Sequence, residues 1–382
     1  MADNREKFNS AYTVYQEHIN AGQTDQALEA ANDAYRYGSK VFGRNHANTA
    51  NLAINYAILL NDTGNHRKAR KTLKGKRDIL EKRYGENATN LVPLFMQLGR
   101  AAKDADETLE YLHRAASLSK GYEDNLDEAE KNFDIMVILL NRDSESLVEP
   151  FVDRAYEIYA ERLQPNDFRL GLMSYHKARW ATSKNQHDDT TDYLLRALQA
   201  FQRSEGPMGG LERSVRMQLV QTYEKLNQPE EATEQLLILG ANQSWFSATD
   251  PVYQPSFKFP EEAIAKRING EISLSFTIDE QGYVINPSVT ESSEEIFNDA
   301  ALEMVRGFRY IPRFVDGKPV ATEGIVYDTS FVFSNPVASR GQFQRPPIKG
   351  MMLPDRNDIS MCFGGGAEAQ SSASCEELPW NK

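Results

Sequence analysis

The stretch Glu271–Thr290, EISLSFTIDEQGYVINPSVT, decides the fold of the C-terminal part of this chain. Its first half alternates polar and apolar residues, a period of two that is typical of a half-buried β-strand. The apolar face carries Ile272, Leu274, Phe276 and Ile278. Glu280–Gly282 supplies a tight turn, and Tyr283–Thr290 has the composition of a return strand. The sequence therefore predicts a β-hairpin with one buried face.

Helical and extended patterns flank this hairpin. Ser293–Phe308 has apolar residues at helical spacing, and Ile325–Phe333 alternates aromatic and polar residues as a last strand does. Pro260–Arg267 predicts a short helix, because proline suits a first turn in which its missing N–H is not needed. The predicted order is helix, strand, strand, helix, strand, which makes this region a small domain with both helices and strands.

The order and several separate motifs resemble the C-terminal domain of the TonB family. The motifs that agree are Phe259-Pro260 with Ala263, Ile268 with Gly270, Phe276-x-Ile278-Asp279 with Gly282 and Val284, Ser292-Ser293 with Phe297 and Ala300-Ala301, Phe308-x-Tyr310-x-Pro312, and Gly317-Lys318-Pro319-Val320. One motif departs: the family opens with Pro-x-Tyr-Pro, where this chain has Phe257-Lys258-Phe259-Pro260. The resemblance covers about residues 250–335. Residues 336–382 are interpreted as a flexible tail because they are rich in glycine and serine.

This resemblance implies a mechanism. TonB proteins couple the inner-membrane ExbB and ExbD motor to outer-membrane transporters by capturing an extended transporter segment, the TonB box, through strand addition. The residues implied to bind the box are Phe259, Pro260, Gly324, Ile325, Val326, Tyr327, Asp328, Thr329, Ser330 and Phe331. The family's membrane helix and proline-rich spacer have no counterpart in this sequence, so any contact with ExbB and ExbD is expected to be indirect.

Residues 1–242 have the pattern of a helical repeat array. The segments YGSKVFGRN (Tyr37–Asn45) and LEKRYGEN (Leu80–Asn87) place Gly43 and Gly85 about 42 residues apart, longer than the minimal 34-residue tetratricopeptide unit. Two amphipathic helices around a turn at Gly64 fit between these glycines. About six such pairs fit before residue 242. They resemble the long-helix type of the tetratricopeptide (TPR) family, which implies a superhelical solenoid with a groove that binds a protein or peptide.

Three asparagines are the candidate groove residues. Asn51, Asn55 and Asn61 fall on or near the inner face of the first helix in the second pair. Asparagine side chains there would hydrogen-bond the backbone of an extended peptide. The alternative is that these are solvated polar positions without a ligand. The sequence does not identify the partner of the repeats.

Composition excludes some functions and leaves the compartment open. The chain has 382 residues and a net charge of −12, which disfavours nucleic acid as a partner because a phosphate backbone requires a basic surface. No apolar stretch reaches membrane-spanning length, and the N-terminus is too hydrophilic for a signal peptide. The TonB resemblance favours a periplasmic protein whose targeting segment is absent from this sequence, and a cytosolic chaperone partner is the remaining possibility. Cys362 and Cys375 are either two free thiols or a disulfide in an oxidising compartment.

No motif predicts catalysis, a cofactor or a metal. Gly364–Gly366 follows no predicted strand and opens no helix, so it is not a phosphate loop. No histidine lies near either cysteine, so zinc spacing is absent. The sequence therefore predicts an α+β multidomain protein that is not an enzyme. The leading hypothesis is a periplasmic TonB-family protein that binds TonB-dependent transporters for energy-coupled uptake and recruits a protein through its repeats. The alternative is a non-transducing scaffold for envelope assembly.

Overall fold

The computed structural model describes residues 2–142, 144–202, 208–242 and 250–332 of the chain. These form two compact units, Met1–Leu163 and Gln164–Lys382. Cys362 and Cys375, interpreted as either two free thiols or a disulfide, lie outside the described residues, as does the expected flexible tail, so these interpretations stay predictions.

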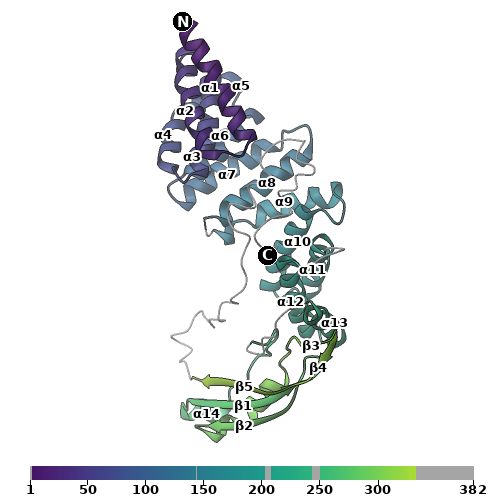
Figure 1. The fold of residues 1–382 in the computed structure, drawn as a ribbon. Helices are drawn as coiled ribbons and strands as arrows, with labels where there is room; N and C mark the ends of the chain where they lie inside the picture. The colour runs from purple at the N-terminus through teal and green to yellow at the C-terminus, as the bar shows by residue number, and fades with distance from the viewer. Residues whose placement is uncertain (1, 143, 203–207, 243–249, 333–382) are drawn as a thin grey trace. The chain divides into compact units, whose positions relative to one another are not determined.

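The first unit consists of consecutive helices that pack pairwise (Figure 1). They are α1 (Ala2–Asn20), α2 (Thr24–Phe42), α3 (Ala47–Asp62), α4 (His66–Leu73), α5 (Lys76–Tyr84), α6 (Val92–Ala101), α7 (Ala105–Ser119), α8 (Asn125–Leu140) and α9 (Glu149–Arg162), with 3₁₀ turns at Thr89–Leu91 and Glu145–Leu147. Gly64 lies in the turn after α3 with a φ of 72°, a left-handed conformation that favours glycine. Ala57 and Ala69 on either side of that turn are fully buried, so the two helices approach closely there.

One predicted helix of this unit is interrupted. The second helix of the second pair was expected to be continuous, but α4 ends at Leu73 and α5 begins at Lys76. Gly75 lies in the break with a φ of 71°, and a β-carbon there would meet no atom within 4 Å. Backbone conformation, and not crowding, therefore requires glycine at this position.

The second unit begins with two more helix pairs and ends with the sheet domain (Figure 1). The helices of the pairs are α10 (Phe168–Ser183), α11 (His187–Phe201), α12 (Gly210–Lys225) and α13 (Pro229–Ala241). The sheet domain comprises α14 (Glu261–Lys266), β1 (Gly270–Ile278), β2 (Val284–Ser292), a 3₁₀ turn (Glu295–Phe297), α15 (Asn298–Arg306), β3 (Arg313–Val315), β4 (Lys318–Val320) and β5 (Thr322–Phe331). Within the described ranges, none of the helices is both long and apolar enough to cross a membrane.

The sheet domain has the predicted order of helix, strand, strand, helix and strand. Its main sheet is antiparallel with strand order β2-β1-β5, and α15 packs against β1 and β2. The core between helix and sheet is formed by Ala263, Ile272, Leu274, Phe276, Ile278, Val284, Phe297, Ala301, Val305, Phe308, Tyr310 and Phe331. All four apolar residues of the first strand are therefore in the core, as the alternation predicts. The short β3–β4 hairpin lies between the predicted helix Ser293–Phe308 and the predicted strand Ile325–Phe333, and it was not predicted.

A buried arginine holds the sheet domain against the last helix pair. Arg309 is 2% exposed, and its guanidinium forms an ion pair with Glu224 of α12. The same group donates to Thr233 Oγ1 of α13 at 2.6 Å and lies 3.7 Å from the ring centroid of Tyr283. Because charged groups are rarely buried unless they are paired, these contacts fix the domain on α12 and α13.

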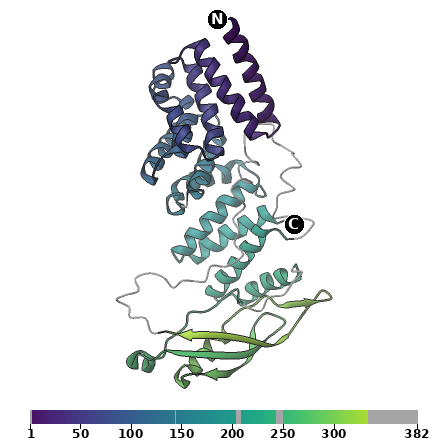
Figure 2. The same ribbon diagram turned by 60° about the vertical axis from the view of Figure 1, so that its left-hand side comes forward.

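The β3–β4 hairpin forms a second contact between the sheet domain and the last helix pair, because it packs against α13 (Figures 1 and 2). A β-carbon at Gly240 of α13 would lie 2.7 Å from both the Phe314 ring and the Pro312 carbonyl oxygen. Glycine is therefore required at this position by the close approach of the hairpin. The sheet domain and the last helices are thus packed directly on one another.

Candidate functional site

The candidate site is β5, the strand at one edge of the sheet. Among the described strands, β5 pairs with β1 on one side only. The register is regular from Ile325 opposite Phe276 to Phe331 opposite Gly270. An edge strand presents unpaired N–H and C=O groups that a further strand can bind. The expectation from the sequence that the last strand forms an edge agrees with this topology.

The direction of each backbone group on β5 follows from the hydrogen bonds on the far side of β1. The Thr290 and Ser288 hydroxyls of β2 donate to the carbonyl oxygens of Ser273 and Ser275, at 3.0 and 3.3 Å. Glu271 likewise exchanges hydrogen bonds with Ser293 beyond the end of β2, donating through its own N–H at 2.9 Å and accepting from the Ser293 N–H at 3.0 Å. The backbone groups of these three β1 residues therefore point toward β2.

Their partners on β5 consequently point the opposite way. Val326, Asp328 and Ser330 lie opposite Ser275, Ser273 and Glu271 in the register. In an antiparallel ladder, opposed residues are either hydrogen-bonded to each other or both turned outward, and the two kinds alternate along the strand. The N–H and C=O groups of Val326, Asp328 and Ser330 therefore face the open edge. Ile325, Tyr327 and Thr329 pair with β1.

The side chains of β5 separate into the same two sets. Ile325, Tyr327 and Thr329 are half-buried toward the core, whereas Val326 is 63% exposed on the other face. The Tyr327 ring packs edge-on against Phe308 with centroids 5.2 Å apart, and burial raises the pKa of its phenol. The core side chains thus anchor the strand, and the outward residues keep both their backbone groups and their side chains available.

The ends of the candidate edge are defined by a bulge and by an aromatic cluster. Gly324 has a φ of 71° and lies where the β1–β5 register shifts, which is typical of a bulge. At the other end, Phe331 is buried and stacks on Phe257 with centroids 4.4 Å apart. Phe259, expected beside the box, packs edge-on against the core residue Phe297 at 5.3 Å. The structure therefore gives Phe259 and Phe331 packing roles.

The three candidate groove asparagines occupy different environments. Asn51 is exposed and Asn55 is half-buried, so their role as groove residues stays a prediction. Asn61 is only 3% exposed, and its amide donates to the backbone oxygen and the side-chain Oε1 of Gln97, at 3.2 and 3.0 Å. The Oδ1 atom of Asn61 lies 3.1 Å from His66 Nδ1. The expectation that Asn61 lines an open groove is wrong, because its polar atoms join the second helix pair to the third.

Within the described ranges, no group of three or more His, Cys, Asp or Glu side chains is arranged to hold a metal ion. Arg309 is the positioning residue that sequence reasoning missed, since its partners come from residues 224, 233 and 283, far apart in the chain.

Comparison with known proteins identifies the two parts of the chain. Residues 255–332 match the family model described as Gram-negative bacterial TonB protein C-terminal, and residues 18–75 match a tetratricopeptide repeat model. The chain thus combines a TonB-type C-terminal domain with a repeat region of a protein-interaction type, and the TonB-type domain implies a location in the cell envelope. None of the curated proteins matches the chain. The crystal structure of BtubC (BKLC) from P. vanneervenii is similar over 67% of this chain and 98% of that chain, with 15% identity and a TM-score of 0.36.

Proposed function

We propose that this protein binds TonB-dependent outer-membrane transporters in the periplasm and takes part in energy-coupled uptake, while its repeats recruit a protein partner. The TonB box of the transporter adds as a strand beside β5. The observation that carries the proposal is the regular run of outward N–H and C=O groups at Val326, Asp328 and Ser330. Backbone pairing would supply affinity, and the exposed side chains of these same three residues would supply selectivity.

A strand bound in this way resists a pull along its length, because several backbone hydrogen bonds must be strained together. A pulling force on the bound strand would pass from β5 through β1 to the turn between β1 and β2. Arg309 links this turn to α12 and α13. This arrangement suits the transmission of force to the repeats. It supports a protein that links a transporter to another envelope component.

The direct test places proline on the candidate edge. Val326→Pro and Asp328→Pro each remove one outward N–H without removing a bond to β1. We expect each variant to bind a synthetic TonB-box peptide from a transporter of the same organism at least about tenfold more weakly, and the double variant to show no measurable binding by calorimetry. Wild-type affinity in the double variant, with its unfolding temperature retained, would eliminate strand addition at β5.

A second candidate function is a non-transducing scaffold. The docking of the sheet domain on α12 and α13 is equally consistent with it, because a domain fixed to the repeats through Arg309 can also hold two envelope proteins together. Uptake assays separate the two functions. A scaffold predicts that cells carrying the double proline variant lose an envelope complex but import transporter substrates at the wild-type rate. Energy coupling predicts that import itself fails in these cells.

A further inference from the structure

A cationic segment of the first unit has no role in the functions described above. Residues 67–83 contain nine lysines and arginines against two acidic residues, in a chain whose net charge is −12. The segment covers α4, the break at Gly75 and most of α5. Like charges held this close repel one another, and this repulsion destabilises the fold unless an opposite charge is near. Such a concentration therefore calls for an anionic partner.

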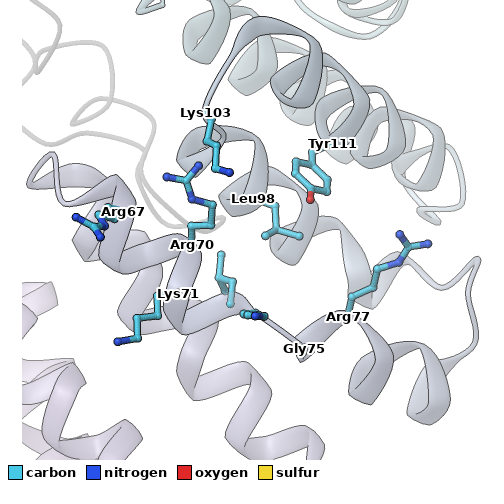
Figure 3. A pocket seen from close by; sticks show the side chains of 10 residues that line it. Arg67, Arg70, Lys71, Gly75, Arg77, Leu98, Lys103 and Tyr111 are labelled. Atoms are coloured by element: carbon cyan, nitrogen blue, oxygen red, sulfur yellow. The ribbon is translucent and has the colours of Figure 1, made fainter.

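Five of these nine cations surround a cavity of about 500 Å³ (Figure 3). Six of its lining residues are cationic, namely Arg67, Arg70, Lys71, Lys74, Arg77 and Lys103. No acidic residue is among those that line it within the described part of the chain. Figure 3 shows that the cations come from α4, from the start of α5 and from the turn before α7. The cavity lies at the helix break, which lets the chain turn around it at Gly75.

Most of this charge is not neutralised within the protein. In the ranges that the structure describes, no ion pair within 4.0 Å involves Arg67, Lys71, Lys74 or Lys103. Arg70 Nη1 is buried without a hydrogen bond, and its ion pair with Glu107 Oε2 is long, at 4.0 Å. A buried guanidinium nitrogen that lacks a hydrogen bond costs free energy, and a bound anion would satisfy it.

The arrangement of the cations favours a chain of anions over a single compact one. Arg67, Arg70, Lys71 and Lys74 recur every three or four residues, so they form a row along one face of α4. At 1.5 Å per residue the row is about 10 Å long, and it continues past the break to Arg77. An extended peptide places alternate side chains about 7 Å apart, so two successive acidic side chains on one face of such a peptide fit within the length of the row.

The remaining wall of the cavity suits an apolar side chain. Leu98 of α6 and Tyr111 of α7 line it opposite the row. Burial raises the pKa of Tyr111, so its hydroxyl stays neutral and does not oppose an anion. We propose that this cavity binds a segment of a partner protein that carries several carboxylates and one apolar residue. The proposal rests on the proposed function only in that the repeats have a protein partner, and it is independent of β5.

The test uses the full chain and a fluorescent peptide of alternating Glu and Asp with one central Phe. Lys71→Glu with Lys74→Glu reverses two exposed charges of the row. Lys82→Glu with Arg83→Glu changes the net charge equally on α5, but neither residue lines the cavity. We expect the first pair to weaken peptide binding at least about tenfold by fluorescence anisotropy, and the second pair to change it less than twofold.

Three further measurements complete the test. A peptide with Gln and Asn in place of the acids is expected not to bind, and the Val326→Pro, Asp328→Pro protein is expected to bind the acidic peptide normally. Equal weakening by both charge-reversal pairs would show non-specific attraction and overturn the proposal. Binding of tripolyphosphate without binding of the peptide would overturn it as well. If the first pair lowers the unfolding temperature, Arg67→Gln with Lys103→Gln replaces it, with the same weakening expected.

Discussion

The two edges of the C-terminal sheet differ in whether a partner strand can bind. On β2, Pro287 has no N–H, Asn286 has a φ of 52°, and the register with β1 shifts twice. On β5, the register is regular from Ile325 to Phe331 and no proline interrupts it. Proline and bulges are the usual means by which an edge is closed to further pairing. The comparison shows that one edge of this sheet is protected and the other is left available.

The largest effect is expected where the protected side of the sheet meets the helices. Arg309 contacts the turn between β1 and β2 through the Gln281 carbonyl oxygen at 3.3 Å, and its ion pair with Glu224 is buried. Arg309→Leu would leave Glu224 without its partner, and we expect the free energy of unfolding of the second unit to fall by about 3–5 kcal/mol. Chemical denaturation followed by circular dichroism measures this loss.

A second substitution checks the cause. Arg309→Leu combined with Glu224→Leu removes both charges, so much of the lost stability should return. An equally unstable double variant would mean that packing around Arg309, and not its charge, holds the domain.

The next largest effect is the difference in stability loss between proline at an inward position of β5 and proline at an outward one. Tyr327→Pro removes an N–H that pairs with β1 and disturbs core packing against Phe308, so we expect a loss of about 3 kcal/mol in unfolding free energy. Val326→Pro removes an outward N–H, and we expect a loss nearer 1 kcal/mol. Thermal unfolding of the two variants measures the difference. If Val326→Pro were the more destabilising of the two, the assigned direction of the backbone groups would be reversed.

A smaller effect is expected on the protected edge. The Thr290 hydroxyl donates to the Ser273 carbonyl oxygen at 3.0 Å. Thr290→Val removes this bond and keeps the shape of the side chain, so we expect a loss of about 1 kcal/mol. Binding of a TonB-box peptide should not change, because the partner strand adds at β5. A weaker affinity in this variant would place the partner strand at β2, where Ser292→Pro would then be the decisive substitution.

The sequence predicts the sheet domain well because its signals are local. Alternation over Glu271–Asp279 identifies the central strand and its buried face, and both are confirmed. The β3–β4 hairpin was missed because strands of three residues are too short to show alternation. The break at Gly75 was missed because a single glycine is often tolerated inside a helix.

The features that depend on tertiary contacts could not be read from the sequence. Asn61 is buried against Gln97, 36 residues away, and Arg309 reaches Glu224, 85 residues away. No local pattern reveals such pairs. The cationic cavity could be predicted only in part. The density of lysine and arginine in residues 67–83 is visible in the sequence, whereas the cavity that they surround is not.

The most direct test of the central claim is residue-resolved amide hydrogen exchange of the full chain, with and without a TonB-box peptide. Without peptide, the outward amides of Val326, Asp328 and Ser330 should exchange much faster than those of Tyr327 and Thr329, which are bonded to β1. With peptide, strand addition predicts strong protection of the three outward amides and little change at the other two. Protection that appears on β2, or no change on β5 at saturating peptide, would contradict strand addition at β5.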